Sequence, residues 1–238
     1  LRTPLTSIRL VAETLQSRLE PPLSRLVDRL VPEINRLINL VQDWLELSQL
    51  EIDPSKKLNR KPLELRSLIQ SVWQTLEPLA RPQQLTLEYS GPDSLWIEAD
   101  ESRLYRVFLN LLDNSIKYSP PQGIIHAEVN LLPPRDDLSR QVQVSIIDSG
   151  SGFPESDLPH VFERLYRGDP SRTRQSSVAP NPLGVPKAKD QVSISSTTGT
   201  GLGLAIARQI ILAHGGAITA SNCPKTGGAL LKIELPYC

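Results

Sequence analysis

The chain has 238 residues, and its 26 basic side chains balance its 26 acidic ones. This length fits one large or two small domains, and the zero net charge excludes a nucleic-acid binder that works by bulk attraction, although it leaves room for a local basic patch. Two cysteines are too few for a disulfide scaffold and favour a reducing compartment. No apolar run approaches the ~18 residues of a membrane span, so we expect a cytoplasmic location for this part of the protein. Residue 1 is a leucine, so we expect the chain to be a piece of a longer protein.

Residues 1–50 carry the pattern of a helical hairpin. Apolar side chains recur with alternating spacings of four and three on both sides of Pro21-Pro22, where a helix cannot continue. The two stripes consist of Leu1, Leu5, Ile8, Ala12, Leu15 and Leu19, and of Val27, Leu30, Ile34, Leu37, Val41, Trp44 and Ser48. Such a hairpin has more apolar surface than it can bury alone, which favours dimerisation into a four-helix bundle. The alternative is a single pair of helices that covers another domain.

A polar segment with Pro54 follows at residues 51–61 and predicts a linker. We place a first domain at 1–53, the linker at 54–61 and a second domain at 62–238. In the second domain, strands alternate with helices that would lie on one face of the sheet, which favours an α/β sandwich. Strands are expected at 63–65, 85–89, 95–98, 124–132, 141–148, 216–221 and 229–235, with a Gly91-Pro92-Asp93 turn after the second. Helices are expected at 66–80, 101–118, 202–214 and, as a short one, near 155–165.

Residues 169–198 have no apolar period and are rich in Ser, Pro, Thr and Lys. A stretch that long inside a compact domain is either a functional lid or a disordered insertion, and the two explanations are compatible.

The helix expected at 101–118 carries the first polar motif. Asn110, Asn114 and Lys117 share one helical face, because residues three and four apart are neighbours on a helix. An amide oxygen is a ligand for Mg²⁺, and a lysine attracts phosphate. Taken alone, this face is more simply explained as a solvated one.

Two glycine motifs follow. The apolar strand 144–147 runs into Asp148, Gly150 and Gly152, and a carboxylate there can accept a hydrogen bond from an adenine amino group. An ordinary turn explains the same residues when they are taken alone. The second motif, GTGLGL at 199–204, opens a helix whose N-terminal N–H groups attract phosphate. It is neither a P-loop nor a dinucleotide fingerprint, because the residues that define those motifs are missing.

The order of these motifs resembles the ATP-binding domain shared by sensor histidine kinases, gyrase-type topoisomerases, Hsp90 chaperones and mismatch-repair ATPases. Within that group the chain resembles a two-component sensor histidine kinase over nearly its whole length. NLLDNSIKY resembles the N-box, DSGSGFP the G1 box, VFERLYRGD the F-box and GTGLGLAIARQIILAHGG the G2 box. LRTPLTSIRL resembles the H-box that opens the phosphotransfer hairpin, which the relatives of other function lack.

The resemblance implies roles for individual residues around a bound ATP. Asn114 would be the Mg²⁺ ligand, Asn110 would lie at the catalytic phosphate end, and Lys117 and Tyr118 would flank the nucleotide. Asp148 would accept from the adenine amino group, while Gly150 and Gly152 let the base approach. The remaining expected residues are Phe162 and Tyr166 at the start of the lid (about 167–198), Arg167, Arg172 and Arg174 as phosphate contacts, and Gly199, Gly201 and Gly203 as phosphate-side turn and hinge.

The resemblance also predicts the reaction. The γ-phosphate of Mg-ATP would move to a histidine and then to an aspartate of a response regulator, within a homodimer. That histidine would stand just before Leu1, so the chain as given should bind ATP without autophosphorylating. Thr3 lies where the family places a residue that helps to hydrolyse the regulator's phosphoaspartate, and His126, His160 and His214 are expected to be structural. The rival hypothesis is a non-catalytic, nucleotide-gated docking module that lacks a phosphoacceptor.

Overall fold

The computed structural model describes residues 15, 23–52, 58–135, 139–166 and 201–237. The second arm of the predicted hairpin is a single long helix, α2 (Leu23–Ile52). Leu15 is also helical, but the rest of the first arm and the Pro21-Pro22 turn lie outside the described residues. None of the helices in the described ranges combines the length and apolar character that a membrane crossing needs.

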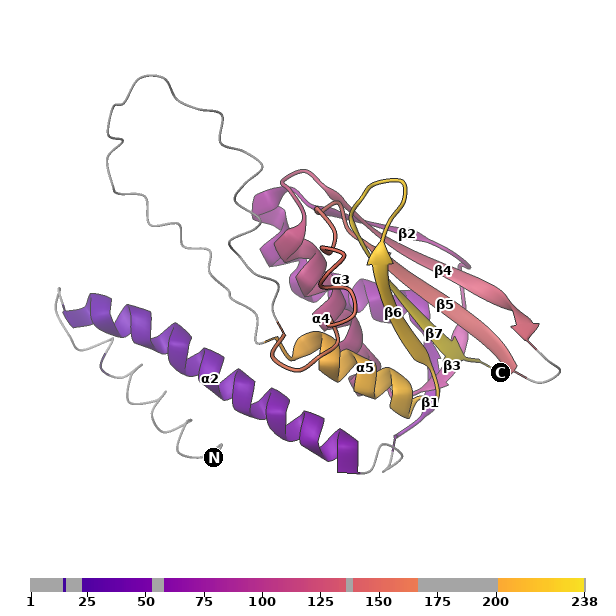
Figure 1. Cartoon of the computed structure of the whole chain (residues 1–238), viewed down its shortest axis with the longest axis horizontal. Coiled ribbons are helices and arrows are strands. Elements are labelled where there is room, and N and C mark those ends of the chain that lie inside the picture. The colour runs from indigo at the N-terminus through magenta and orange to yellow at the C-terminus, as the bar shows by residue number, and fades with distance from the viewer. Residues whose placement is uncertain (1–14, 16–22, 53–57, 136–138, 167–200, 238) are drawn as a thin grey trace, which may run out of the picture.

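The described residues between 61 and 236 form a two-layer α/β sandwich (Figure 1). A five-stranded sheet in the order β2-β4-β5-β7-β6 makes one layer, and α3, α4 and α5 cover one of its faces. The elements are β1 (Lys61–Glu64), α3 (Leu65–Ala80), the short 3-10 helix η1 (Arg81–Gln83), β2 (Thr86–Ser90), β3 (Trp96–Ala99), α4 (Glu101–Tyr118), β4 (Ile124–Arg135), β5 (Ser139–Ile147), α5 (Gly203–Ala213), β6 (Ala217–Asn222) and β7 (Ala229–Pro236). This agrees with the predicted fold class.

The turn at Gly91-Pro92-Asp93 does not make a hairpin, although strands lie on both sides of it. β2 pairs in parallel with β4, with Thr86 opposite Ile124. β3 instead pairs antiparallel with β1, with Trp96 opposite Glu64, in a separate two-stranded sheet. Alternation of apolar residues identifies both strands but not their partners.

The prediction of a short helix near 155–165 is wrong. Consecutive i to i+3 turns occupy this segment, in which Asp157 N donates to Pro154 O and His160 N donates to Asp157 O, and Leu158 N adds a single i to i+4 bond to Pro154 O. The segment ends at Leu165, whose φ of +59° lies in the left-handed region that a side-chain-bearing residue rarely adopts. Successive turns with that ending cannot propagate a continuous helix.

The helix α4 is placed by its cap and its apolar stripe. Asp100 is the N-cap, and its Oδ1 accepts from Arg103 N at 3.2 Å. The buried side chains of the helix are Leu104, Val107, Phe108, Leu111, Leu112, Ser115 and Ile116. Their stripe faces the core, so the polar face with Asn110 and Asn114 is left half-buried at the edge of the helix layer.

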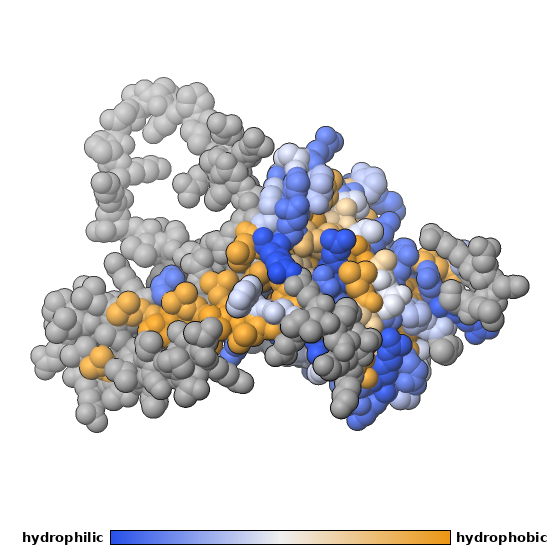
Figure 2. Space-filling model, turned by 60° about the horizontal axis from the view of Figure 1, so that its bottom comes forward, coloured by the Kyte–Doolittle hydropathy of each residue, from blue (hydrophilic) through white to orange (hydrophobic). Residues whose placement is uncertain are grey.

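The long helix α2 carries apolar side chains on two faces. Leu47 is 1% exposed and Leu40 packs against the core of the sandwich, while Arg106 on α4 reaches Asp43 at 2.5 Å. Leu30, Leu37 and Trp44, seven residues apart, are instead between 51% and 55% exposed. Figure 2 shows apolar side chains gathered along this helix. One helix thus contacts the α/β sandwich and still presents an uncovered apolar stripe.

Candidate functional site

Asp148 lies at the carboxyl end of β5 and is only 6% exposed. Its Oδ1 accepts two backbone hydrogen bonds, from Gly150 N at 2.9 Å and from Ala229 N at 2.8 Å. Its own N–H donates to Ala229 O at 3.0 Å, which ties the residue to β7. Within the described part of the chain both side-chain bonds end on Oδ1, so Oδ2 is left to meet a donor from a ligand.

Burial raises the pKa of Asp148 above its usual value, while the hydrogen bonds from Gly150 and Ala229 act in the opposite direction. Removing a carboxylate from water is costly unless both of its oxygens are compensated. Such a group at the end of a buried strand is typical of a binding residue.

The glycines near Asp148 have packing reasons of their own. A Cβ at Gly150 would lie 2.6 Å from Tyr118 O, at the end of α4. Gly152 has a φ of +71°, and a Cβ there would lie 2.4 Å from Gly227 O. A Cβ at Gly228 would lie 1.9 Å from Asp148 O. The backbone around Asp148 is therefore packed so closely that these positions tolerate no side chain.

The two asparagines on the polar face of α4 differ in their contacts. Asn110 Nδ2 donates to Gly203 O at 3.1 Å, so its amide joins α4 to the start of α5. Asn114 is half-buried, and no described residue hydrogen-bonds to its side chain. Lys117 pairs with Asp113 one turn earlier, and Tyr118 is 73% exposed.

The donor set suits a metal that is shared with a ligand. Among the described residues no three His, Cys, Asp or Glu side chains gather as a metal cluster. Asn114 would supply one neutral amide oxygen, which is a donor type that Mg²⁺ accepts when phosphates and waters complete its octahedron. The described residues thus fit Mg²⁺ that arrives with a nucleotide.

The base of the predicted lid is closed by backbone contacts. Leu165 N donates to Gly201 O at 2.9 Å, and Gly201 has a φ of +72°. Phe162 packs against the core, with the Arg208 guanidinium 5.9 Å from its ring centre. The other predicted positions, which are Thr3, Arg167, Arg172, Arg174 and Gly199, lie outside the described residues.

The three histidines have protein partners. His214 is buried at the end of α5, where its Nε2 accepts from Asp100 N at 3.1 Å and its Nδ1 donates to Ile210 O at 2.8 Å. His126 Nδ1 lies 3.4 Å from Glu88, and His160 Nδ1 lies 2.7 Å from Glu163. These contacts agree with structural roles.

The sequence reasoning missed two side chains that hold the loop after Asp148. Ser149 Oγ donates to Ile124 O at 2.6 Å and accepts from Ile124 N at 3.0 Å. Asn222, at the end of β6, bonds both backbone groups of Phe153. Nothing local marks either residue, because each partner is distant in the sequence.

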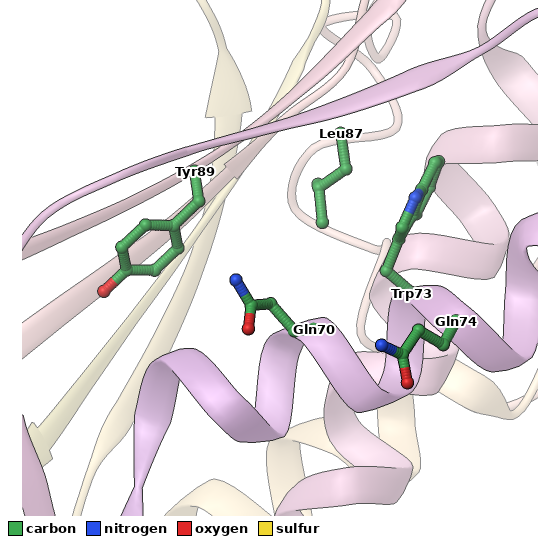
Figure 3. A pocket seen from close by; sticks show the side chains of 5 residues that line it. All are labelled: Gln70, Trp73, Gln74, Leu87 and Tyr89. Atoms are coloured by element: carbon green, nitrogen blue, oxygen red, sulfur yellow. The ribbon is translucent and has the colours of Figure 1, made fainter. Parts of the chain in front are cut away.

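A hollow of about 370 Å³ lies elsewhere, between α3 and the edge strand β2. Figure 3 shows its lining side chains, with Gln70, Trp73 and Gln74 from α3 and Leu87 and Tyr89 from β2. It contains none of the predicted site residues.

Comparisons with known proteins find matches to both parts of the chain. Residues 99–237 match the family model described as Histidine kinase-, DNA gyrase B-, and HSP90-like ATPase, and residues 1–52 match the His Kinase A (phospho-acceptor) domain. The chain is 46% identical over 236 residues to the sensor protein SphS of Synechococcus elongatus, which covers 99% of the chain and 52% of SphS. It is 30% identical over 243 residues to the sensor histidine kinase WalK of Bacillus subtilis, which covers 100% of the chain and 35% of WalK.

Solved structures match the chain as well. The mycobacterial sensor histidine kinase MprB matches 75% of this chain and 97% of its own, at 26% identity and a TM-score of 0.55. Full-length ShkA in complex with AMPPNP matches 100% of this chain and 44% of its own, with a TM-score of 0.73; at 23% identity this likeness shows the fold alone. The chain spans about half, or less, of the length of SphS and WalK. The chain belongs to the histidine kinase-, DNA gyrase B- and HSP90-like ATPase family and, with its phospho-acceptor domain, forms the core of a two-component sensor histidine kinase.

Proposed function

We propose that this core binds Mg-ATP, transfers the γ-phosphate to a histidine just before Leu1, and passes it to an aspartate of a response regulator. In this proposal residues 1–53 are the dimerisation and phosphotransfer hairpin, residues 54–61 the linker and residues 62–238 the ATP-binding domain, with a lid at about 167–198. Thr3 would support hydrolysis of the regulator's phosphoaspartate.

The observation that carries the proposal is the buried carboxylate of Asp148. Its Oδ1 is held by two backbone N–H groups, so Oδ2 has a fixed direction before any ligand arrives. An ionised acceptor at that point suits the adenine amino group, whereas guanine has a carbonyl oxygen in the equivalent place. A hydrogen bond to a charged group contributes about 1.5–3 kcal/mol. Adenine specificity then follows from one atom.

The phosphate end would be served by α4 and by the start of α5. Asn114 would hold Mg²⁺ through its amide oxygen, and Mg²⁺ would offset charge on the phosphates. The first N–H groups of α5 have no acceptor within the helix itself, as at every helix start, and such groups attract anions. Asn110 keeps the two helices together by its bond to Gly203 O. Gly199, Gly201 and Gly203 would form the turn at the phosphates, with Lys117, Tyr118, Arg167 and Arg172 as flanking contacts. Catalysis would rest on positioning the γ-phosphate in line with the acceptor nitrogen.

The partners are a second copy of the chain and a response regulator receiver domain. The exposed stripe of Leu30, Leu37 and Trp44 on α2 supports dimerisation, because monomeric proteins rarely leave a long apolar stripe in water. The histidine kinase ThkA has been solved in complex with the response regulator protein TrrA, at 24% identity to this chain. That likeness is the reason to expect a receiver domain as partner here.

The reaction is tested by restoring an acceptor. The chain with a His-Glu pair added before Leu1, incubated with labelled ATP and Mg²⁺, should give an acid-labile and alkali-stable phosphoprotein. The chain as printed should bind ATP in calorimetry but stay unlabelled. Binding without labelling in the extended chain would favour the non-catalytic docking module, and absence of ATP binding in both would refute the proposal.

Dimerisation is tested on α2. Leu37→Asp and Trp44→Asp place charges in the exposed stripe and should give monomers in light scattering. Gln42→Lys, at an exposed position outside the stripe, is the matched control and should remain dimeric. A dimer that survives both aspartates would refute the assignment of this face.

A further inference from the structure

We infer that Asn222 is a positioning residue for the adenine end of the nucleotide site, an inference that rests on the proposed function. Phe153 N donates to Asn222 Oδ1 at 2.7 Å, and Asn222 Nδ2 donates to Phe153 O at 2.8 Å. The amide thus closes on both backbone groups of one residue. Its orientation is fixed, because exchanging oxygen and nitrogen would set donor against donor and acceptor against acceptor.

This clamp holds one end of the loop that follows Asp148. The other end is held by Ser149, whose Oγ bonds both Ile124 O and Ile124 N. Between these two points the loop contains Gly150, whose N–H donates to Asp148 Oδ1, and Gly152, whose backbone φ lies in the left-handed region. The position of the Asp148 carboxylate therefore depends on a short backbone segment that side chains fix at both ends.

The packing around Asn222 leaves the clamp little freedom. A Cβ at Gly152 would lie 2.6 Å from Asn222 Oδ1, so the amide already touches the loop backbone. Phe153 also packs against the main hydrophobic core. Asn222 in turn ends β6, directly before the turn whose Gly228 lies against Asp148 O. The clamp therefore links the loop after β5 to the β6–β7 turn, and both segments contact Asp148.

Such a residue acts on binding of the base, not on the phosphates. Without the clamp, residues 149–153 would have to become ordered each time a base binds. The entropy cost of this ordering lowers the affinity. Asn222→Ala should weaken binding of adenosine, ADP and ATP by the same factor, about 5- to 30-fold, which corresponds to two neutral hydrogen bonds. In the chain with a restored His-Glu pair, KM for ATP should rise by that factor while kcat stays unchanged.

The experiment compares Asn222→Ala with Asn130→Ala, an exposed asparagine on β4 of the same sheet. Calorimetry with the three ligands gives the affinities, and hydrogen exchange of the Phe153 amide reports the clamp directly. We expect faster exchange at Phe153 and equal losses for the three ligands in Asn222→Ala, with the control unchanged. Unchanged affinity, a loss confined to ATP, or a fall in kcat would overturn the inference.

A second variant covers the case in which Asn222→Ala does not fold. Asn222→Asp has the same size and keeps the acceptor for Phe153 N, but it loses the donor to Phe153 O. Its affinity for adenosine should be lower than that of the unmodified chain, and equal affinity would overturn the inference. If the unmodified chain binds no adenine ligand, the proposed function fails instead, while exchange at Phe153 still reports whether the clamp exists.

Discussion

The Asp148 site and the hollow between α3 and β2 differ in what forms their walls. The hollow has about 370 Å³ of space, and side chains such as Gln70, Trp73 and Leu87 line it. Around Asp148 the walls are backbone segments, and a Cβ added at Gly150, Gly152 or Gly228 would lie only 1.9 to 2.6 Å from a backbone oxygen. Four hydrogen bonds hold these segments in place. The hollow, in contrast, is lined by side chains of one helix and one edge strand.

The proposed nucleotide site therefore rests on a fixed polar group and not on the volume of a hollow. Side chains that line a hollow can change rotamer on a picosecond to nanosecond scale when they are exposed, so they direct a ligand weakly. A buried carboxylate held by backbone donors needs no reorganisation when a base arrives, which is the condition for strong electrostatic recognition. The predictions below test this contrast, from the largest expected effect to the smallest.

The largest effect is expected at Gly228. Gly228→Ala places a methyl group 1.9 Å from Asp148 O, so the β6–β7 turn must move and carry Ala229 N away from the carboxylate. We expect a loss of about 3 kcal/mol in unfolding free energy and no measurable ATP binding. Gly227→Ala is the comparison: Gly227 has a left-handed φ of +76°, which Gly228 does not share, and a Cβ there meets nothing within 4 Å. It should cost less stability than Gly228→Ala, and equal damage from both variants would show that the collision at Asp148 O is not the main cost.

Asp148→Asn should separate binding from stability. It removes an ionised acceptor, so ATP affinity should fall roughly 10- to 150-fold, as calorimetry can measure. Because burial raises the pKa of Asp148, its ionised form destabilises the nucleotide-free protein at pH values above that raised pKa. The unfolding midpoint of the variant without ATP should therefore be equal to or higher than that of the unmodified chain near neutral pH. ATP and GTP that bind alike, with no effect of the substitution, would contradict the assignment.

Trp73→Ala tests the other side of the contrast. Trp73 is half-buried in the hollow and packs against the core, so its loss should lower the unfolding free energy by about 2 kcal/mol. ATP affinity should stay within about twofold of its original value, a range below 1 kcal/mol. Trp96→Ala removes the same side chain at a position that is 56% exposed and should cost less stability. A tenfold loss of ATP affinity in Trp73→Ala would mean that the hollow is coupled to the site.

His214 offers a smaller, pH-dependent effect at the opposite end of α4. Burial lowers the pKa of His214, and the positive charges of Arg60 and Arg103 act in the same direction, while Ile210 O and Asp100 oppose it. A histidine whose pKa is lower when folded contributes stability above its usual value of 6.5 and loses it as pH falls below that value. Denaturant titrations should show unfolding free energy declining below pH 6.5 by up to about 1.4 kcal/mol per pH unit. His214→Gln should remove that part of the decline, whereas His160→Gln should keep it.

Local patterns were enough to predict most elements of the α/β sandwich. The helix predicted at 101–118 is α4 with the same bounds, because Asp100 caps it and its apolar residues recur at helical spacing. Asp148 could be singled out because an acid and glycines after an apolar strand are unusual, and its contact with adenine stays a prediction. The partners of β2 and β3 were not predictable, since strand pairing depends on contacts between distant segments.

The polar interior was the part that the sequence concealed. Asn222 acts on Phe153, 69 residues earlier, and only the folded sheet brings the two together. Asn110 hydrogen-bonds Gly203 O across the helix layer, a bond that residue spacing does not predict, while its place at the phosphate end stays a prediction. Both residues are asparagines, so residue type alone cannot distinguish a side chain that binds a ligand from one that hydrogen-bonds within the protein.

The bond between Leu165 N and Gly201 O has a consequence for how this domain can vary and be engineered. It holds Leu165 and Gly201, the described ends of the chain on either side of 167–200, together on the body of the sandwich. Since each doubling of a loop's length costs about 0.6 kcal/mol, the number of residues between these ends can change with little penalty. A peptide tag or a fluorescent reporter inserted between these two residues should therefore leave the domain folded.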